Sequence, residues 1–139
     1  MLECEAAVQA NPRDVSAWYD LGIKQQENER DGEAILALSK VVQLDPNHRQ
    51  GHLALAVSYT NESQNEAAQI SLAEWARLVD ERYQIDPAAE GFKQRHASLI
   101  EIFLDIARTA PEGEIDADVQ VALGVLFSTS QVSDAKGLV

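Results

Sequence analysis

The sequence has little cysteine, no long hydrophobic run and no basic start, and each shortage excludes a class of protein. Cys4 is the only cysteine, so no disulfide can form within the chain, which suits a reducing compartment. No apolar run approaches the roughly 18 residues that a membrane-spanning helix needs. The start, MLECEAAVQA, carries acids and no base, so it is not a secretory signal. The 139 residues suffice for one domain or for a piece of a larger one.

Basic residues are also scarce. Eleven Lys and Arg stand against 23 Asp and Glu, which gives a net charge of −12. Such a charge repels nucleic-acid backbones and anionic membranes, and it favours basic partners. We therefore expect no nucleic-acid partner. An acidic surface also keeps a protein soluble, so most individual carboxylates need no further role.

What the sequence does have is a repeat with a period of 34 residues. With Val15 as position 1, the positions 4, 7, 8, 20, 24 and 32 hold Trp18, Leu21, Gly22, Ala34, Leu38 and Pro46. The next copy fits the same frame with His52, Leu55, Ala56, Tyr59, Ala68, Leu72 and Trp75, and a last copy starts with Leu123, Gly124 and Phe127 at positions 7, 8 and 11. This is the tetratricopeptide (TPR) period, which predicts an all-α solenoid of antiparallel helix pairs. Small residues at positions 8 and 20 allow the two helices of a pair to approach closely.

The repeat frame divides the chain into five parts. Residues 1–13 are the second helix of a preceding repeat, 14–47 the first TPR, 48–80 the second, 81–113 a degenerate third, and 114–139 the first helix of a following, incomplete repeat with a tail. The third repeat is irregular because its first part is polar and holds Pro87 and Gly91. Asp14 and Asn47 are the expected N-caps of the helices that follow them. The array looks truncated, and its two open ends predict self-association.

Motifs for catalysis and metal binding are absent or incomplete. The chain has no phosphate-binding glycine loop, no G-x-S-x-G and no zinc-type set of Cys and His. His48 and His52 have a spacing that could hold a metal, but His52 occupies the packing position of Trp18 and no third ligand is obvious. Cys4 falls at the buried position 24, which favours an inert core thiol. We therefore expect no enzyme, no metal site and no cofactor.

Polar side chains end two successive first helices, and first helices line the inner groove of a TPR array. Thr60 and Asn61 hold positions 12 and 13 of their repeat, and Glu27 holds position 13 one repeat earlier. The Asn61 amide offers a donor and an acceptor, so it can bind a peptide backbone. Glu27, Glu29 and Asp31 can attract a ligand Lys or Arg. The alternative is that the residues after Thr60 merely terminate a helix.

The chain resembles the peroxisomal targeting signal 1 receptor, or peroxin-5, family over about residues 2–131. The likeness is carried by ALAVSYTNES (54–63), AWYDLGIKQQENER (17–30) and DADVQVALGVLF (116–127), and the irregular third repeat also fits the family. The resemblance implies a non-catalytic cytosolic receptor that recognises cargo ending in Ser-Lys-Leu and carries it to the peroxisomal membrane. The full receptor of that family has two TPR triplets around the cargo tail. This chain would be the first triplet.

The resemblance also implies a site made of six residues: Val57, Thr60, Asn61, Glu27, Glu29 and Asp31. The first three would contact the cargo tail, with Asn61 holding tail backbone. The three acids would lie near the cargo lysine, whose charge they complement. The family's anchors for the terminal carboxylate lie in the second triplet, which is absent here. Peroxisomal docking proteins would bind through the rest of the receptor.

A second interpretation is a co-chaperone TPR adaptor that binds the acidic C-terminal tail of a heat-shock chaperone. That function needs a basic clamp of Lys and Asn along the inner helices. The inner-facing candidates of the first repeat, Tyr19, Ile23 and Glu27, are neutral or acidic. The sign of the charge therefore favours the import receptor. An enzyme with an unfamiliar site is a third class, and no motif supports it.

Overall fold

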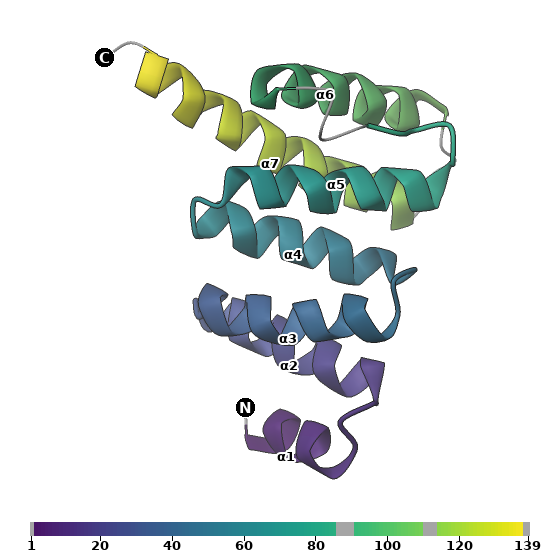
Figure 1. Cartoon of the computed structure of the whole chain (residues 1–139), viewed down its shortest axis with the longest axis vertical. Helices are drawn as coiled ribbons and strands as arrows, with labels where there is room; N and C mark the ends of the chain where they lie inside the picture. Colours follow the sequence, from purple (N-terminus) through teal and green to yellow (C-terminus); the bar gives the residue numbers. More distant parts are fainter. Residues whose placement is uncertain (1, 86–90, 110–113, 138–139) are drawn as a thin grey trace.

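The computed structural model is a stack of α-helices, which confirms the predicted all-α array. It describes residues 2–85, 91–109 and 114–137, and the side chains of residues 3–85, 91–109 and 117–129. Along this part of the chain the helices are α1 (Leu2–Ala10), α2 (Val15–Glu27), α3 (Asp31–Leu44), α4 (Arg49–Asn61), α5 (Asn65–Val79), α6 (Phe92–Thr109) and α7 (Glu114–Gly137) (Figure 1).

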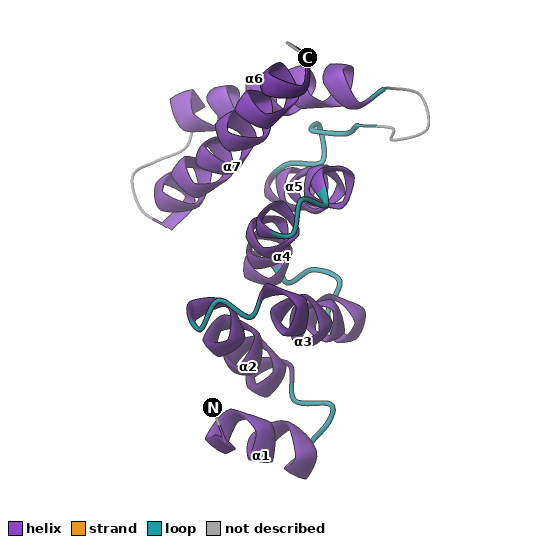
Figure 2. Ribbon diagram, turned by 90° about the vertical axis from the view of Figure 1, so that its left-hand side faces the viewer, coloured by secondary structure: helices purple, strands orange, loops and turns teal. Residues whose placement is uncertain are grey.

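Successive helices pack as pairs, and the pairs stack on one another. α2 packs against α3, α4 packs against α5, and α3 joins the two pairs by packing against α4. Figure 2 looks nearly along the helix axes and shows α2 and α4 on one side of the stack, with α3 and α5 on the other. First helices therefore form one row and second helices form another, as the 34-residue period predicts.

The two helices of the first pair approach closely because repeat position 8 is glycine. A Cβ placed on Gly22 would lie only 2.6 Å from the Cγ atom of Leu38. Leu38 and Ala34, on the facing helix α3, are fully buried. The second pair uses alanine for the same purpose, and Ala56 and Ala68 are buried as well. The small residues that define the repeat frame thus lie where the helices meet.

The third layer differs from the first two. Residues 81–85 and Gly91 are not helical, while Pro87 lies in the segment 86–90, outside the described residues. α6 packs against α5 and α7, and α7 also packs against α4 while running obliquely to the other helices (Figure 1). α7 therefore takes the place beside α4 that the first helix of a regular third repeat would take.

One apolar core holds this third layer on the second pair. Its fully buried members come from four helices: Ala56 of α4, Trp75 and Ala76 of α5, Leu99 and Phe103 of α6, and Ala122 of α7. The rings of Trp75 and Phe103 stack with their centroids 5.3 Å apart. Aromatic pairs at this separation add to the free energy of burial. On the other side of α7, Val121 and Phe127 are 45% and 51% exposed, which agrees with the expected uncovered helix face.

The helix caps confirm one of the two predicted residues. Asp14 caps α2, since its side chain accepts a hydrogen bond from the Ala17 amide. The prediction of Asn47 for α4 is wrong, because His48 holds the cap and its Nδ1 accepts from the Gly51 amide at 2.9 Å. The backbone amide of Asn47 instead donates to Asp45, in the turn that precedes the helix. This turn moves the cap one residue along the chain.

Two glycines at the same repeat position test the close-packing account. Gly22→Ala is expected to lower the free energy of unfolding by about 1–3 kcal/mol, because the new methyl group would overlap Leu38. Gly124→Ala should raise it by about 0.5–1 kcal/mol, because nothing lies within 4 Å and alanine favours a helix. Urea unfolding followed by circular dichroism measures both changes. Shifts of the same sign in the two variants would contradict the account.

Candidate functional site

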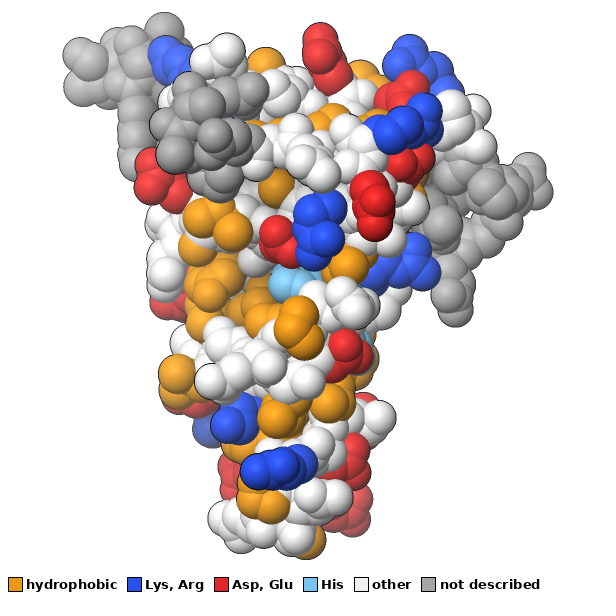
Figure 3. Space-filling view, turned by 45° about the vertical axis from the view of Figure 1, so that its right-hand side comes forward, with side chains coloured by type: hydrophobic (Ala, Val, Ile, Leu, Met, Phe, Trp, Pro, Cys, Tyr) orange, Lys and Arg blue, Asp and Glu red, His pale blue; other side chains and the backbone are white. Residues whose placement is uncertain are grey.

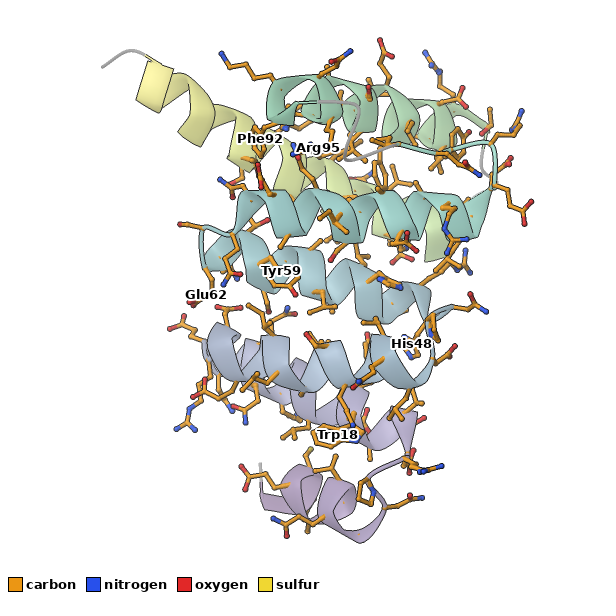
Figure 4. All side chains as sticks on the ribbon, viewed as in Figure 1. Trp18, His48, Tyr59, Glu62, Phe92 and Arg95 are labelled. Atoms are coloured by element: carbon orange, nitrogen blue, oxygen red, sulfur yellow. The ribbon has the colours of Figure 1, made fainter. Side chains whose placement is uncertain are left out.

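The six residues of the predicted site lie where α2 and α4 end and where the next helices begin. α2 ends at Glu27 and α4 ends at Asn61, so both helices stop at repeat position 13. Each then turns through a residue with a φ of 60°, Glu29 in the first turn and Ser63 in the second. Figure 4 shows the second turn at Glu62.

Hydrogen bonds make the two turns equivalent. The Arg30 amide donates to the Gln25 carbonyl oxygen, and the Gln64 amide donates to the Tyr59 carbonyl oxygen, both at 2.8 Å. A second bond in each turn runs to the penultimate residue of the helix. This is the Schellman arrangement, in which the residue with positive φ is usually glycine. It directs the chain from Asn61 back along α5, and from Glu27 back along α3.

Asp31 and Asn61 meet across this end of the stack. Asp31 is the first residue of α3, and its Oδ1 accepts a hydrogen bond from Asn61 Nδ2 at 3.2 Å. The same oxygen accepts a bond from the hydroxyl of Ser58 at 2.9 Å. A carboxylate at a helix N-terminus is favourable because the partial charge of the helix dipole is positive there. Of the six residues, all of which the structure describes, Asp31 and Asn61 are joined directly.

Gln26 and Ser58 complete the cluster and were missed by the sequence analysis. Gln26 Nε2 donates to Ser58 Oγ at 2.8 Å and to the Ala54 carbonyl oxygen at 3.0 Å. Ser58 is fully buried, so its hydroxyl needs these partners. We name Gln26, Asp31, Ser58 and Asn61 the Asp31 network. One sequence feature could have indicated it, because Ser58 is a hydroxyl inside the otherwise apolar run LALAVS.

The other four predicted residues lie around this network with separate contacts. Glu27 is exposed and lies 3.5 Å from Lys24 on its own helix. Thr60 donates its hydroxyl hydrogen to the Ala56 carbonyl oxygen of α4 at 2.8 Å. Glu29 is exposed in the turn after α2, and Val57 is half-buried on α4. The surface thus offers carboxylates, a hydroxyl oxygen and an amide close along the chain.

Carboxylates also occur where α7 meets the first helices. Gln50 of α4 donates to Asp118 of α7 at 2.8 Å. Tyr19, an expected inner residue of α2, lies with its ring centroid 5.1 Å from that of His48. Burial raises the pKa of Tyr19, and the negative charges of Asp118 and Asp20 raise it further. Tyr19 therefore stays protonated at neutral pH and keeps a hydroxyl donor in acidic surroundings.

A separate recess opens between α3 and α5, with α4 as its floor. Its volume is about 280 Å³, and its lining is mainly apolar, with Val42, Leu55 and Ile70 among the residues. Figure 3 shows hydrophobic side chains gathered around pale-blue histidine atoms in the middle of that face. His52 lines the recess, and its Nε2 lies 2.9 Å from the Pro46 carbonyl oxygen. Trp18 makes the equivalent bond to Pro12 one repeat earlier, so the smaller imidazole ring keeps the bond but fills less space.

Curated proteins match this sequence along nearly its whole length. The peroxisomal targeting signal receptor of Yarrowia lipolytica is 39% identical, over 96% of this chain and 24% of that protein. The chain belongs to the peroxisomal targeting signal receptor family. The receptor of Komagataella phaffii is 34% identical over the same shares, and peroxisome biogenesis protein 5 of Arabidopsis thaliana is 35% identical over 96% of this chain and 18% of that protein. No protein-family model matches the sequence.

This member of the receptor family spans about a quarter of the length of the yeast relatives it matches, since it covers 24% of them. Its histidines at 48 and 52 are engaged within the fold, as an N-cap and as a partner of a carbonyl oxygen. Within residues 2–85, 91–109 and 114–137, no group of three or more His, Cys, Asp or Glu is arranged to hold a metal ion. None of the helices described here is long and apolar enough to span a bilayer.

The turn that presents Asn61 in this receptor homologue can be tested through Ser63. Ser63→Gly is expected to raise the free energy of unfolding by about 0.5–1 kcal/mol, because glycine adopts a φ of 60° without steric strain. Ser63→Val should lower it, since a β-branched residue fits that conformation poorly. Ser16→Gly, at an exposed helical position of α2, is the control and should also lower it. Denaturant melts give all three values, and a destabilising Ser63→Gly would contradict the turn geometry.

Proposed function

We propose that this chain is part of the cargo-binding module of a peroxisomal import receptor and that it recognises C-terminal Ser-Lys-Leu-type tails of matrix proteins. The observation that carries the proposal is the Asp31–Asn61 pair at the ends of the first helices, in a chain whose relatives are named peroxisomal targeting signal receptors. The role is binding and transport, without catalysis. The receptor would work in the cytosol and cycle to the peroxisomal membrane, where docking proteins would bind its other parts.

The chemistry of the site supports a peptide that carries a lysine. The chain has a net charge of −12, and Glu27 and Glu29 are both exposed beside the Asp31 network. Opposite charges speed association and favour a cationic ligand over an anionic one. Val57 adds apolar surface on α4, and the Thr60 hydroxyl oxygen can still accept a hydrogen bond from a ligand.

The same charges argue against the co-chaperone interpretation. An acidic chaperone tail would meet the carboxylates of Glu27, Glu29 and Asp31, and like charges brought together disfavour binding. Lys24 is the one lysine of α2, and it already lies within salt-bridge distance of Glu27. The receptor proposal therefore needs no change in the charge of the site, whereas the adaptor would need a basic clamp.

The isolated chain is expected to bind a Ser-Lys-Leu peptide weakly or undetectably, because the anchors for the terminal carboxylate would lie in later repeats. Fluorescence anisotropy of a labelled peptide measures this, with the chain extended through three more repeats as the positive control. Micromolar or tighter binding by the isolated chain would show that the division between the repeats is wrong. Sedimentation at the same concentrations tests self-association through the exposed residues of α7, and a purely monomeric mass would exclude it.

Asn61→Ala in the intact receptor should weaken binding of the same peptide by about 1–3 kcal/mol, because a ligand backbone group would lose its partner in the complex. Asn47→Ala is the matched control, since Asn47 is an exposed asparagine outside the proposed site. It should leave the affinity unchanged. Equal affinities for the wild-type receptor and the Asn61→Ala variant would remove Asn61 from the site.

A further inference from the structure

We propose that Asp31 is a positioning residue: it binds the amide nitrogen of Asn61 and so directs the amide oxygen towards the ligand. The inference rests on the proposed function and deepens it. It assigns Asn61 one role, as an acceptor for a peptide N–H, and it takes Asp31 out of direct contact with the cargo lysine.

The first step concerns the direction of the hydrogen bonds. An ionised carboxylate only accepts, so the group that Asn61 turns towards Asp31 must be its NH₂. The Asn61 oxygen, on the other branch of the amide, then points away from the carboxylate. An unrestrained asparagine can present either end of its amide, because the two ends differ little in size. Asp31 therefore selects one of the two orientations.

The second step concerns what holds Asp31. Its Oδ1 accepts from Ser58, and the Ser58 oxygen accepts in turn from Gln26. Because the single hydroxyl hydrogen of Ser58 goes to Asp31, the direction of each bond in the chain is fixed. Ser58 is fully buried, Asp31 is half-buried and Asn61 is exposed. The network thus starts in the core between α2 and α4 and ends at the one side chain that a ligand can reach.

The third step compares the two repeats. At position 13 of the first repeat, Glu27 is a carboxylate that lies 3.5 Å from Lys24 on the same helix. At position 13 of the second repeat, Asn61 is held from another helix, by the first residue of α3. Two side chains at equivalent positions therefore differ in support. We infer that α4 supplies the oriented contact to peptide backbone, while α2 supplies negative charge.

The test separates positioning from direct charge contact. Asp31→Asn keeps an oxygen that can accept from Ser58 and Asn61 but removes the charge, whereas Asp31→Ala removes both. Binding of two peptides by the intact receptor is measured, one ending in Ser-Lys-Leu and one with norleucine in place of the lysine. We expect Asp31→Ala to weaken both peptides by about tenfold, and Asp31→Asn to stay within about threefold of wild type.

A double variant adds the decisive comparison. If Asp31 acts through Asn61, then Asp31→Ala causes no further loss in a receptor that already carries Asn61→Ala. Additive losses would overturn the inference. So would an Asp31→Asn variant as weak as Asp31→Ala with an effect that vanishes for the norleucine peptide, since that pattern marks a direct contact with lysine. A wild-type receptor that fails to bind the Ser-Lys-Leu peptide would overturn the proposed function instead.

A readout without ligand keeps the inference testable apart from binding. The side-chain amide signals of Asn61 are followed by NMR in this chain, with those of Asn47 as the control. Asp31→Ala should shift the Asn61 signals and leave the Asn47 signals in place, while Asp31→Asn should shift them less. Asn61 signals that do not respond to Asp31→Ala would contradict the proposed contact, whatever the affinity of the receptor.

Discussion

The close approach of paired helices is the constraint on which the rest of this structure depends. Gly22 leaves just enough space for Leu38, and the alanines of the second pair have the same function. Because the helices lie so close, the pairs stack in register every 34 residues and bring the ends of α2 and α4 to the same side. The Asp31 network forms there, since α3 starts where α4 ends.

Much of the fold could be predicted from the sequence, because a repeat shows the same local rule several times. The lengths of the first helices followed from the frame, and so did the position of Asn61 at the end of α4. The third layer could not be predicted, because no local pattern says which helix fills a place left open. α7 lies beside α4 since its residues Val119, Ala122 and Leu126 complete a core with α4 and α6.

The site was predictable as a set of positions but not as a network. Periodicity places Asn61 and the acidic stretch at neighbouring helix ends, and the structure joins Asp31 to Asn61. Gln26 and Ser58 escaped the sequence analysis because their bonds join residues 27–32 apart, whose meeting depends on how two helices pack. The same holds for the histidine cap of α4, where one hydrogen bond in the preceding turn moved the start of the helix.

A structure of the intact receptor with a Ser-Lys-Leu peptide would test the central claim most directly. The account predicts a hydrogen bond from a backbone N–H of the tail to Asn61 Oδ1, with Asn61 Nδ2 still bound to Asp31. A peptide that lies elsewhere, or one whose lysine is bonded to Asp31 while Asn61 faces solvent, would contradict it.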